Sequence, residues 1–271
     1  MKVGVIGATG YVGGRLVPHL LDAGHSVRCL ARTPERLRDV EWRDSVEVVP
    51  ADVLDQASLV AGFRDLDAVY YLVHAMGHAG NFAEADRQGA ENTRHAAEAA
   101  GVGRIIYLGG LGDDGPDELS HHLASRHEVG DVLAAGSVPV TELRAAVIIG
   151  SGSASLEMLR DLDEVLPVMI CPRWVTKTRC QPIAIFDVLL YLVAVLDEPA
   201  AAGRVLEIGG PEVHTYREML DSYARAAGLP RRLVIPVPVL TPRLSSHWVN
   251  LVTPLPYGLA KPLVDSLRND V

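Results

Sequence analysis

The N-terminal glycine turn constrains the fold of this chain more than any other feature. An apolar run, Val3–Ile6, predicts a buried strand, and three regularly spaced glycines follow it, Gly7, Gly10 and Gly13. The next segment, Arg15–Leu21, repeats its apolar residues at helical intervals. Glycines permit a tight turn and a close approach of pyrophosphate, and a helix N-terminus offers free N–H groups. This order predicts a dinucleotide site; the alternative is a turn that only packs the first helix.

Strands and helices alternate through the first half of the chain. Most of the predicted strands are rich in Val, Ile and Leu and apolar on both faces, as in a parallel sheet covered on both sides. They are Lys2–Ile6, Ser26–Leu30, Val46–Val49, Ala68–Leu72, Arg104–Leu108 and Val140–Arg144. The predicted helices are Gly13–Asp22, Gln56–Gly62, Asn81–Ala100 and His121–Ala135. Repeated βα units predict a Rossmann-like α/β fold with a doubly wound parallel sheet and a ligand at the carboxyl ends of the strands.

The second half of the chain has a different character. We expect residues 1–150 to form the nucleotide-binding domain and residues 151–271 to form a small substrate-binding region packed on it. Ile148–Ser155 is a Gly/Ser turn, and Pro167–Gln181 is predicted to be irregular.

Later segments of this half carry clearer signals. Asp187 is expected to cap a helix over Val188–Leu196, and Arg204–Ile208 predicts a strand. Thr215 and Glu218 have the spacing of a capping box that begins another helix.

Composition excludes some classes of function. The chain has 271 residues and a formal net charge of −9, which argues against non-specific nucleic-acid binding. Its 3 cysteines have no CxxC spacing, and the sequence enters its first strand at once, so we expect a cytoplasmic protein without a disulfide framework. His74 and His78 lack a third ligand, so no metal site is predicted.

Membrane contact is a separate question. The longest apolar run, Val188–Leu196, is too short to span a bilayer. Leu233–Leu263 is rich in proline and apolar enough to lie on the protein, a ligand or a membrane surface. Peripheral membrane contact through this segment therefore stays open, as does the oligomeric state.

The second strand bears on the choice of cofactor. NAD-selective sites place an acidic residue near the end of this strand to bind the ribose hydroxyls, and no acid is found there. Arg32 occupies the position where a 2′-phosphate would lie, which favours NADP over NAD. Asp52, after the third strand, is a candidate acceptor for the adenine amino group. A solvated loop arginine and a turn aspartate are the respective alternatives.

Several segments resemble one known superfamily. The glycine turn, Ala51–Asp55 and Gly209–Pro211 resemble extended or atypical short-chain dehydrogenases/reductases. Tyr71–Gly77, Tyr107–Gly112 and Leu143–Ser155 are similar to atypical members described as NAD(P)H-binding proteins, and the resemblance covers nearly the whole chain. It implies a nucleotide across Gly7, Thr9, Gly10, Tyr11 and Val12, with Arg32, Asp52 and Val53 at its adenosine end and Leu72 to His74 beside the nicotinamide ribose.

The chain departs from that superfamily where catalysis is expected. Active members carry Tyr-x-x-x-Lys at the start of the helix before the sixth strand, and a serine after the fifth strand. The matching helical run here is His122–Arg126, and Gly109 and Gly110 stand where the serine would be. His122 and Arg126 lie on one helix face, so they are the candidate catalytic pair; a polar helix start is the alternative.

The expected function follows from these residues. The chain is predicted to be an NADP-dependent oxidoreductase of the atypical type that acts on a small or lipophilic substrate, with NAD as a possible cofactor. The resemblance also implies the candidate substrate-binding residues, because extended members of the superfamily place substrate-facing residues at this point of the chain: Arg179, Cys180 and Gln181. Because the usual proton-transfer residues are missing, a non-catalytic sensor of the NADPH/NADP balance is the alternative, and whether the protein is an enzyme stays open.

Overall fold

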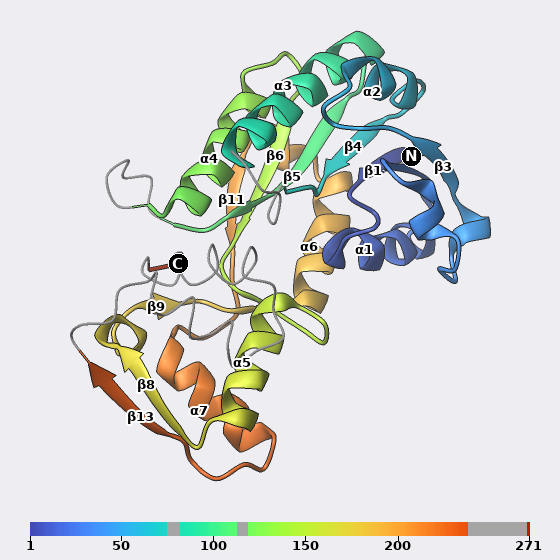
Figure 1. Ribbon diagram of the computed structural model, residues 1–271. Coiled ribbons are helices and arrows are strands. Elements are labelled where there is room, and N and C mark those ends of the chain that lie inside the picture. The colour runs from blue at the N-terminus through green and yellow to red at the C-terminus, as the bar shows by residue number, and fades with distance from the viewer. Residues whose placement is uncertain (75–81, 113–118, 238–269) are drawn as a thin grey trace.

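The computed structural model describes residues 1–74, 82–112, 119–237 and 270–271. Two parts are visible in Figure 1. The sheet half contains a central sheet with helices on both sides. The C-terminal lobe, as we call it below, contains α5 (Ala154–Val165), β8 (Val168–Pro172), α7 (Tyr216–Ala226) and β13 (Leu233–Val237).

The central sheet has 7 parallel strands in the order β11-β6-β5-β4-β1-β2-β3. This order confirms the Rossmann-like doubly wound prediction, because the chain starts in the middle of the sheet and builds outwards in both directions. The strands are β1 (Lys2–Ile6), β2 (Ser26–Ala31), β3 (Glu47–Pro50), β4 (Ala68–Tyr71), β5 (Arg104–Gly110), β6 (Val140–Ala145) and β11 (Val205–Ile208).

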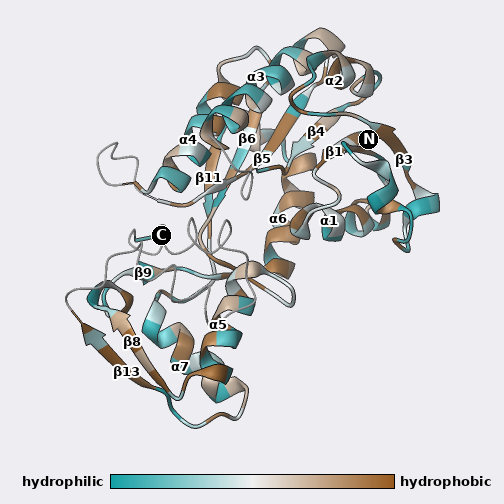
Figure 2. Ribbon diagram, viewed as in Figure 1, coloured by the Kyte–Doolittle hydropathy of each residue, from teal (hydrophilic) through white to brown (hydrophobic). Residues whose placement is uncertain are grey.

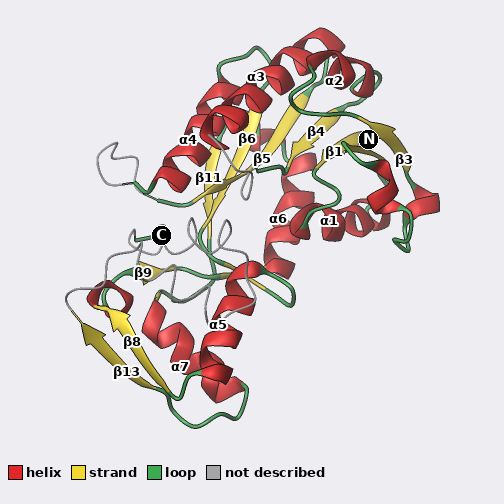
Figure 3. Ribbon diagram, viewed as in Figure 1, coloured by secondary structure: helices red, strands yellow, loops and turns green. Residues whose placement is uncertain are grey.

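Helices cover both faces of this sheet (Figure 3). On one face, α1 (Tyr11–Asp22) and α6 (Ile185–Asp197) contact each other and share an apolar core with β1 and β4. On the other face, α2 (Gln56–Gly62), α3 (Phe82–Ala100) and α4 (His121–Ala134) form the second apolar core. Successive strand residues alternate between the cores, which is why these strands are apolar throughout.

Helix α6 is the most apolar helix of the sheet half (Figure 2). It joins the sheet through side chains as well as through packing. The Tyr70 hydroxyl on β4 donates to the Leu192 carbonyl oxygen at 2.9 Å, and the Arg104 guanidinium donates to carbonyl oxygens at the end of the helix, that of Val195 at 2.6 Å. The helix begins at Ile185 with Ala184 as N-cap, so the predicted cap Asp187 is wrong. Asp187 lies in the first turn, where a carboxylate still favours the helix dipole.

Residues beyond 150 complete the sheet of the first half. Strand β11 pairs with β6 in parallel register, from Val205 opposite Glu142 to Ile208 opposite Ala145. The sheet and its covering helices therefore contain residues from both sides of the predicted boundary at residue 150.

The C-terminal lobe has its own apolar core, drawn from its strands and helices. The stretch predicted to be irregular contains the whole of β8, which pairs in parallel with β13. The capping box at Thr215 is confirmed: its side chain accepts from the Glu218 N–H, and the Glu218 side chain accepts from the Thr215 N–H. Helix α5, capped by Ser153, begins at the end of the predicted Gly/Ser turn.

Short elements connect these parts. Four two-residue strands form two pairs: β7 (Ile148–Ile149) with β10 (Ile183–Ala184), and β9 (Arg179–Cys180) with β12 (His214–Thr215). The 3-10 helices span Pro34–Leu37, Arg43–Ser45, Arg173–Thr176 and Pro199–Ala201. None of the described helices is both long and apolar enough to cross a membrane. Of the Pro-rich segment Leu233–Leu263, only β13 lies within the described residues.

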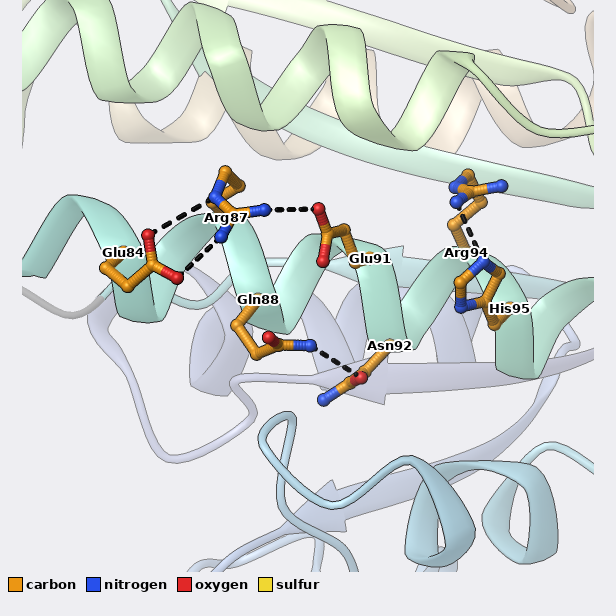
Figure 4. A network of polar contacts seen from close by, with 7 residues as sticks. All are labelled: Glu84, Arg87, Gln88, Glu91, Asn92, Arg94 and His95. Atoms are coloured by element: carbon orange, nitrogen blue, oxygen red, sulfur yellow. Dashed lines mark hydrogen bonds and ion pairs between the residues drawn. The ribbon is translucent and has the colours of Figure 1, made fainter.

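Helix α3 carries a network of polar side chains (Figure 4). Arg87 lies between Glu84 and Glu91, one helical turn away on either side, and pairs with both. Gln88 donates to Asn92 at 3.1 Å on the same helix. Such neighbouring pairs each stabilise a helix only slightly, by about 0.2–0.5 kcal/mol.

Candidate functional site

The glycine turn has the geometry that a phosphate cradle needs. Gly7 has φ of +94°, a conformation that side chains disfavour, and a Cβ there would lie 2.6 Å from the Leu72 carbonyl oxygen. The Gly10 N–H donates to the Gly7 carbonyl at 2.9 Å and closes the turn. A Cβ at Gly13 would collide with the backbone of Gly7. Gly7 and Gly13 are therefore needed for the backbone to fold this tightly.

Helix α1 begins directly after this turn. Its N-cap is Gly10, which contributes no side-chain hydrogen bond, and its first turn holds no acidic residue. The first N–H groups of the helix therefore keep their capacity to bind an anion, and the positive end of the helix dipole points toward it. The turn and the helix together fit the pyrophosphate of a dinucleotide.

A smaller cavity of about 250 Å³ lies beside the turn. Besides His74, it collects five of the residues predicted to bind cofactor: Gly7, Thr9, Arg32, Asp52 and Val53. They come from the carboxyl ends of β1, β2 and β3, because parallel strands bring their ends to one edge. The structure therefore brings together residues that lie up to 46 positions apart in the sequence.

Two arginines line this cavity and remain exposed, Arg32 and Arg36. Within the described chain, neither guanidinium has a hydrogen bond or an ion pair, so both are available to an anion in the cavity. Asp52 has a structural role as well, since its carboxylate accepts from the Leu54 N–H at 3.0 Å. Its predicted contact with adenine would use the remaining acceptor capacity.

A larger cavity of about 350 Å³ lies between the sheet half and the C-terminal lobe. The sheet half contributes the predicted residues Tyr11, Val12, Leu72, His74, His122 and Arg126. The lobe contributes apolar side chains, among them Met158, Leu159 and Met219. His74 lines both cavities, so the two are neighbours across this residue.

One buried carboxylate and two partly buried imidazoles form a line of hydrogen bonds at the larger cavity. The Asp86 carboxylate Oδ2 lies 2.7 Å from His74 Nδ1, and His74 Nε2 lies 3.0 Å from His122 Nδ1. Ser125 Oγ also donates to Asp86 Oδ2, at 3.3 Å. The line runs from α3, through the segment after β4, to the first turn of α4.

Burial controls the charge of both histidines. It lowers the pKa of His74 below the usual value, although the Asp86 carboxylate opposes the shift. Burial, with the neighbouring His74 and Arg126, lowers the pKa of His122 to about 3. Both imidazoles are therefore neutral at pH 7 in the free protein.

Arg126 is already engaged by the protein. Its guanidinium donates to the Leu108 carbonyl near the end of β5 and lies over the Tyr107 ring, 5.0 Å from the ring centroid. The Tyr107 hydroxyl in turn donates to the Arg126 carbonyl at 2.9 Å. This arrangement ties α4 to β5 and positions the edge of the larger cavity.

The three candidate substrate residues lie outside the lining of the larger cavity. Arg179 is exposed on β9, and Cys180 is fully buried in the core of the lobe. The Gln181 side chain donates to the Gly210 carbonyl at 2.7 Å. Of the three side chains, that of Gln181 therefore ties the segment after β9 to the segment after β11. Arg144, on β6, pairs with buried Glu142 at 2.9 Å.

Asp86 was missed by sequence reasoning, although a signal was present. It begins a series on α3, Asp86, Ala90, Thr93 and Ala97, whose members are all buried and recur at helical spacing. A carboxylate on the buried stripe of an amphipathic helix requires a partner, and a histidine is a suitable one. Arg36 was also missed as a lining residue. It lies in the 3-10 helix Pro34–Leu37, after β2, and the sequence gave no comparable signal for it.

Other residues occupy the positions at which the superfamily has its catalytic residues. The α4 position of Tyr-x-x-x-Lys holds His122 and Arg126, as predicted. At Gly109, a Cβ would lie 2.5 Å from Glu142 Oε1, so no serine side chain fits there without rearrangement. The Tyr-x-x-x-Lys spacing does occur once in the C-terminal part of the sequence, at Tyr257 and Lys261, which lie outside the described residues.

Metal ligands are not gathered anywhere in the described ranges: no group of three His, Cys, Asp or Glu side chains there could hold an ion. His78, the second member of the predicted pair with His74, lies outside these ranges.

The sequence matches a family model described as NAD(P)H-binding over residues 7–155. A reductase from Streptomyces griseus, named (4-alkanoyl-5-oxo-2,5-dihydrofuran-3-yl)methyl phosphate reductase, is 30% identical over 235 residues, which are 84% of this chain and 74% of that protein. Ceramide reductase from Caulobacter vibrioides is 31% identical over 272 residues, 96% and 82% of the respective chains.

A solved structure has the same fold. Triphenylmethane reductase from Citrobacter sp., in complex with NADP(H), superposes with a TM-score of 0.76 at 19% identity. The match covers all of this chain and 91% of that one. At this identity the likeness shows the fold only.

Proposed function

Because the chain belongs to the NAD(P)H-binding family, within the atypical short-chain dehydrogenases/reductases, we propose that it is a reductase that prefers NADP(H). Its substrate is a small or lipophilic compound bound in the larger cavity. One observation carries this proposal: a cavity beside the glycine turn and an apolar cavity meet at His74. The first suits the adenosine end of a dinucleotide, and the second places a substrate beside the nicotinamide end.

The preference for NADP rests on charge. Arg32 and Arg36 present two guanidinium groups without internal partners to the smaller cavity. A 2′-phosphate there gains charge-assisted hydrogen bonds that a plain ribose hydroxyl does not offer. The complex of triphenylmethane reductase with NADP(H) is consistent with this preference.

The lipophilic substrate class rests on the lining of the larger cavity. Most of its side chains are apolar, and those from the lobe, such as Met158 and Met219, are long and adaptable. An apolar compound with one reducible group fits such a site, since His122 offers a polar contact within a mostly apolar lining. The name of one relative, ceramide reductase, is consistent with a lipophilic substrate.

The mechanism divides between cofactor and protein. When bound, the nicotinamide supplies the hydride that reduces the substrate. The α1 N-terminus holds the pyrophosphate, and the apolar lining excludes water from the reacting groups. His122 moves the proton at Nε2, and Arg126 positions the Leu108 carbonyl at the cavity edge.

The first test is calorimetric titration of NADPH, NADP, NADH and NAD. We expect the wild type to bind NADPH tightly and Arg32→Ala to lose affinity for NADPH and NADP by about tenfold, the equivalent of one charge-assisted contact. NADH affinity should change little. Arg38→Ala is the matched control, since Arg38 is exposed and lies outside the cavity lining. Failure of all four nucleotides to bind the wild type would contradict the proposal.

A sensor of the NADPH/NADP balance is the second candidate. The observation that favours it is the replacement of tyrosine, lysine and serine at the expected positions by His122, Arg126 and Gly109. A sensor should bind the oxidised and reduced forms with clearly different affinities and turn over no acceptor. Oxidation of NADPH in the presence of a quinone or carbonyl panel would favour the reductase.

A further inference from the structure

The Asp86–His74–His122 line is a buried polar chain whose ends differ. At one end, Asp86 is only 5% exposed and contacts His74 at 2.7 Å. At the other end, His122 lines the larger cavity. Burial of a carboxylate next to two imidazoles is costly unless the hydrogen bonds are satisfied, so their directions are constrained.

The carboxylate sets the direction of every proton in the line. An ionised carboxylate only accepts, so His74 Nδ1 carries the proton and donates to Asp86. Neutral His74 then has a lone pair on Nε2, which accepts from His122 Nδ1–H at 3.0 Å. His122 Nε2 is left unprotonated, and it has no hydrogen-bond partner among the described residues.

Other polar groups around the line leave this assignment intact. Ser125 donates its hydroxyl to Asp86 Oδ2, so it adds a donor to the carboxylate and takes no proton from the line. Arg126, one turn beyond His122, opposes a positive charge on both imidazoles. Tyr71 on β4 is fully buried, and burial raises its pKa, so this hydroxyl stays protonated.

We propose that Asp86, His74 and His122 form a proton relay that ends at His122 Nε2 in the larger cavity. The relay takes the place of the tyrosine and lysine used by other members of the superfamily. This inference rests on the proposed reductase function. In it, His122 is the catalytic residue, while His74 and Asp86 are positioning residues that act through it.

The relay moves one proton while the cofactor moves a hydride. Before the reaction, His122 Nε2 takes a proton from solvent and His122 Nδ1 passes its own proton to His74 Nε2, so His74 becomes an imidazolium. In reduction of a carbonyl group, the hydride adds to the carbon, and the oxygen takes the proton from His122 Nε2. His122 Nδ1 then takes the proton back from His74 Nε2, and both imidazoles return to their neutral forms. The sum is one NAD(P)H and one proton consumed, with one alcohol and one NAD(P)⁺ formed. Oxidation of the alcohol runs through the same steps in reverse.

In the relay, the positive charge of the extra proton is held by His74 and not by His122. His122 is a poor store, because burial and two neighbouring groups disfavour its charged form. His74 is next to a carboxylate, which stabilises an imidazolium through a charge-assisted hydrogen bond. Arg126 cannot supply the proton, since a guanidinium does not release one at these pH values.

The test is the tautomeric state of the histidines, read by 15N NMR on labelled protein with and without NADPH. The chain has 10 histidines, and the signals of His74 and His122 are assigned from their loss in His74→Gln and His122→Gln. At pH 7 we expect both to be neutral with the proton on Nδ1. A proton on Nε2 of either residue in the nucleotide-free wild type at pH 7 overturns the relay.

Asp86→Asn supplies the second arm. Loss of the anionic acceptor should shift His74 toward the Nε2–H tautomer, and His122 should follow because two donors cannot face each other. Glu91→Gln is the matched control: it is the same change on the same helix, but in the network with Arg87 (Figure 4). Unchanged tautomers in folded Asp86→Asn contradict the relay.

The same variants separate the relay from the proposed function. NADPH affinity should be unaffected by Asp86→Asn, while turnover of a carbonyl acceptor should fall by on the order of 10²-fold, as when acid–base catalysis is lost. If the wild type binds no nucleotide and turns over no acceptor, the proposed function fails, whatever the tautomers. If it turns over acceptors but Asp86→Asn does so equally well, only the relay fails.

Discussion

The central sheet buries both of its faces, whereas the β8–β13 pair of the lobe buries one. Core strands such as β4 have every residue buried. In the lobe, Met169 and Val234 point to the core, and their neighbours Ile170 and Ile235 are exposed in the part of the chain that is described. A strand held on both faces tolerates little change, and a strand held on one face tolerates more. The comparison indicates a fixed sheet half and a C-terminal lobe whose sequence is freer to vary.

The largest expected effect lies in the fixed region. Gly13→Val would push a side chain into the backbone of Gly7 and open the turn that holds the phosphates. We expect NADPH affinity to fall by at least about 100-fold, roughly 3 kcal/mol. Calorimetry measures this loss. Gly14→Ala is the control, since its Cβ would lie 3.1 Å from the Ala8 carbonyl and needs only a small shift. Equal binding by both variants would show that the turn is not rigid.

A second prediction asks whether the two regions are separately stable. Leu192→Ala removes a fully buried side chain of α6, and Leu220→Ala removes one of α7 in the lobe. Each should lower the free energy of unfolding by about 2–4 kcal/mol. Hydrogen exchange should lose protection mainly in the sheet half for the first variant and mainly in the lobe for the second. A uniform loss across the chain in both cases would mean that the regions unfold as one unit.

The sequence predicted the two regions unequally. The six strands predicted in the first half are all present, with ends within two residues of those observed, because buried parallel strands have a strong apolar signal. In the lobe, β8 was missed because its residues alternate in burial over five positions and include Pro172. Pairing with β13, more than sixty residues later, is what makes this segment a strand.

The candidate site shows the same limit. The turn glycines and His122 follow from local motifs, and so does Arg32. Asp86 belongs to no motif, and its closeness to His74 arises only because α3 packs over the carboxyl end of β4. Arg179, Cys180 and Gln181 were chosen by analogy with relatives, and in this fold they lie at the junction of the halves.

Low pH should destabilise the sheet half, because burial disfavours the protonated form of His122. The folded-state pKa of His122 is about 3, well below the value near 6.5 of an unfolded histidine. The unfolded state therefore binds more protons below pH 6.5, and stability is lost as the pH falls through that value. Between pH 7 and pH 5 we expect a loss of about 2 kcal/mol from this group alone.

Denaturant titrations at both pH values measure this effect. His122→Gln should show a shallower pH dependence than the wild type, and His95→Gln, which changes an exposed histidine, should not. Identical pH dependence in His122→Gln and the wild type would contradict a neutral, buried His122.

The smallest prediction concerns the lobe. Asp163 on α5 is fully buried, and its carboxylate has no hydrogen-bond partner among the described residues. Burial raises the pKa of this group to about 6, although Arg232 opposes the shift. A raised folded-state pKa stabilises the protein below the unfolded value and costs stability as pH rises through pH 6.

Asp163→Asn should therefore raise the stability at pH 8 by about 1 kcal/mol and leave it almost unchanged at pH 4. Thermal unfolding at the two pH values measures the difference. Asp161→Asn is the control, since Asp161 already pairs with Arg160. A destabilised Asp163→Asn at pH 8 would mean that Arg232 compensates the buried charge.

The position of α6 and β11 has a consequence for the synthesis of the protein. A ribosome delivers the first half of the sheet, with α1, long before residues 185–208, which cover one of its faces and extend its edge. Until then the apolar face formed by β1 and β4 has no α6 against it, and the β6 edge has no neighbour. Nascent chains in this interval expose surface that holding chaperones bind. Slow translation of codons 150–208 would lengthen the exposure and increase aggregation without changing a single residue of the finished protein.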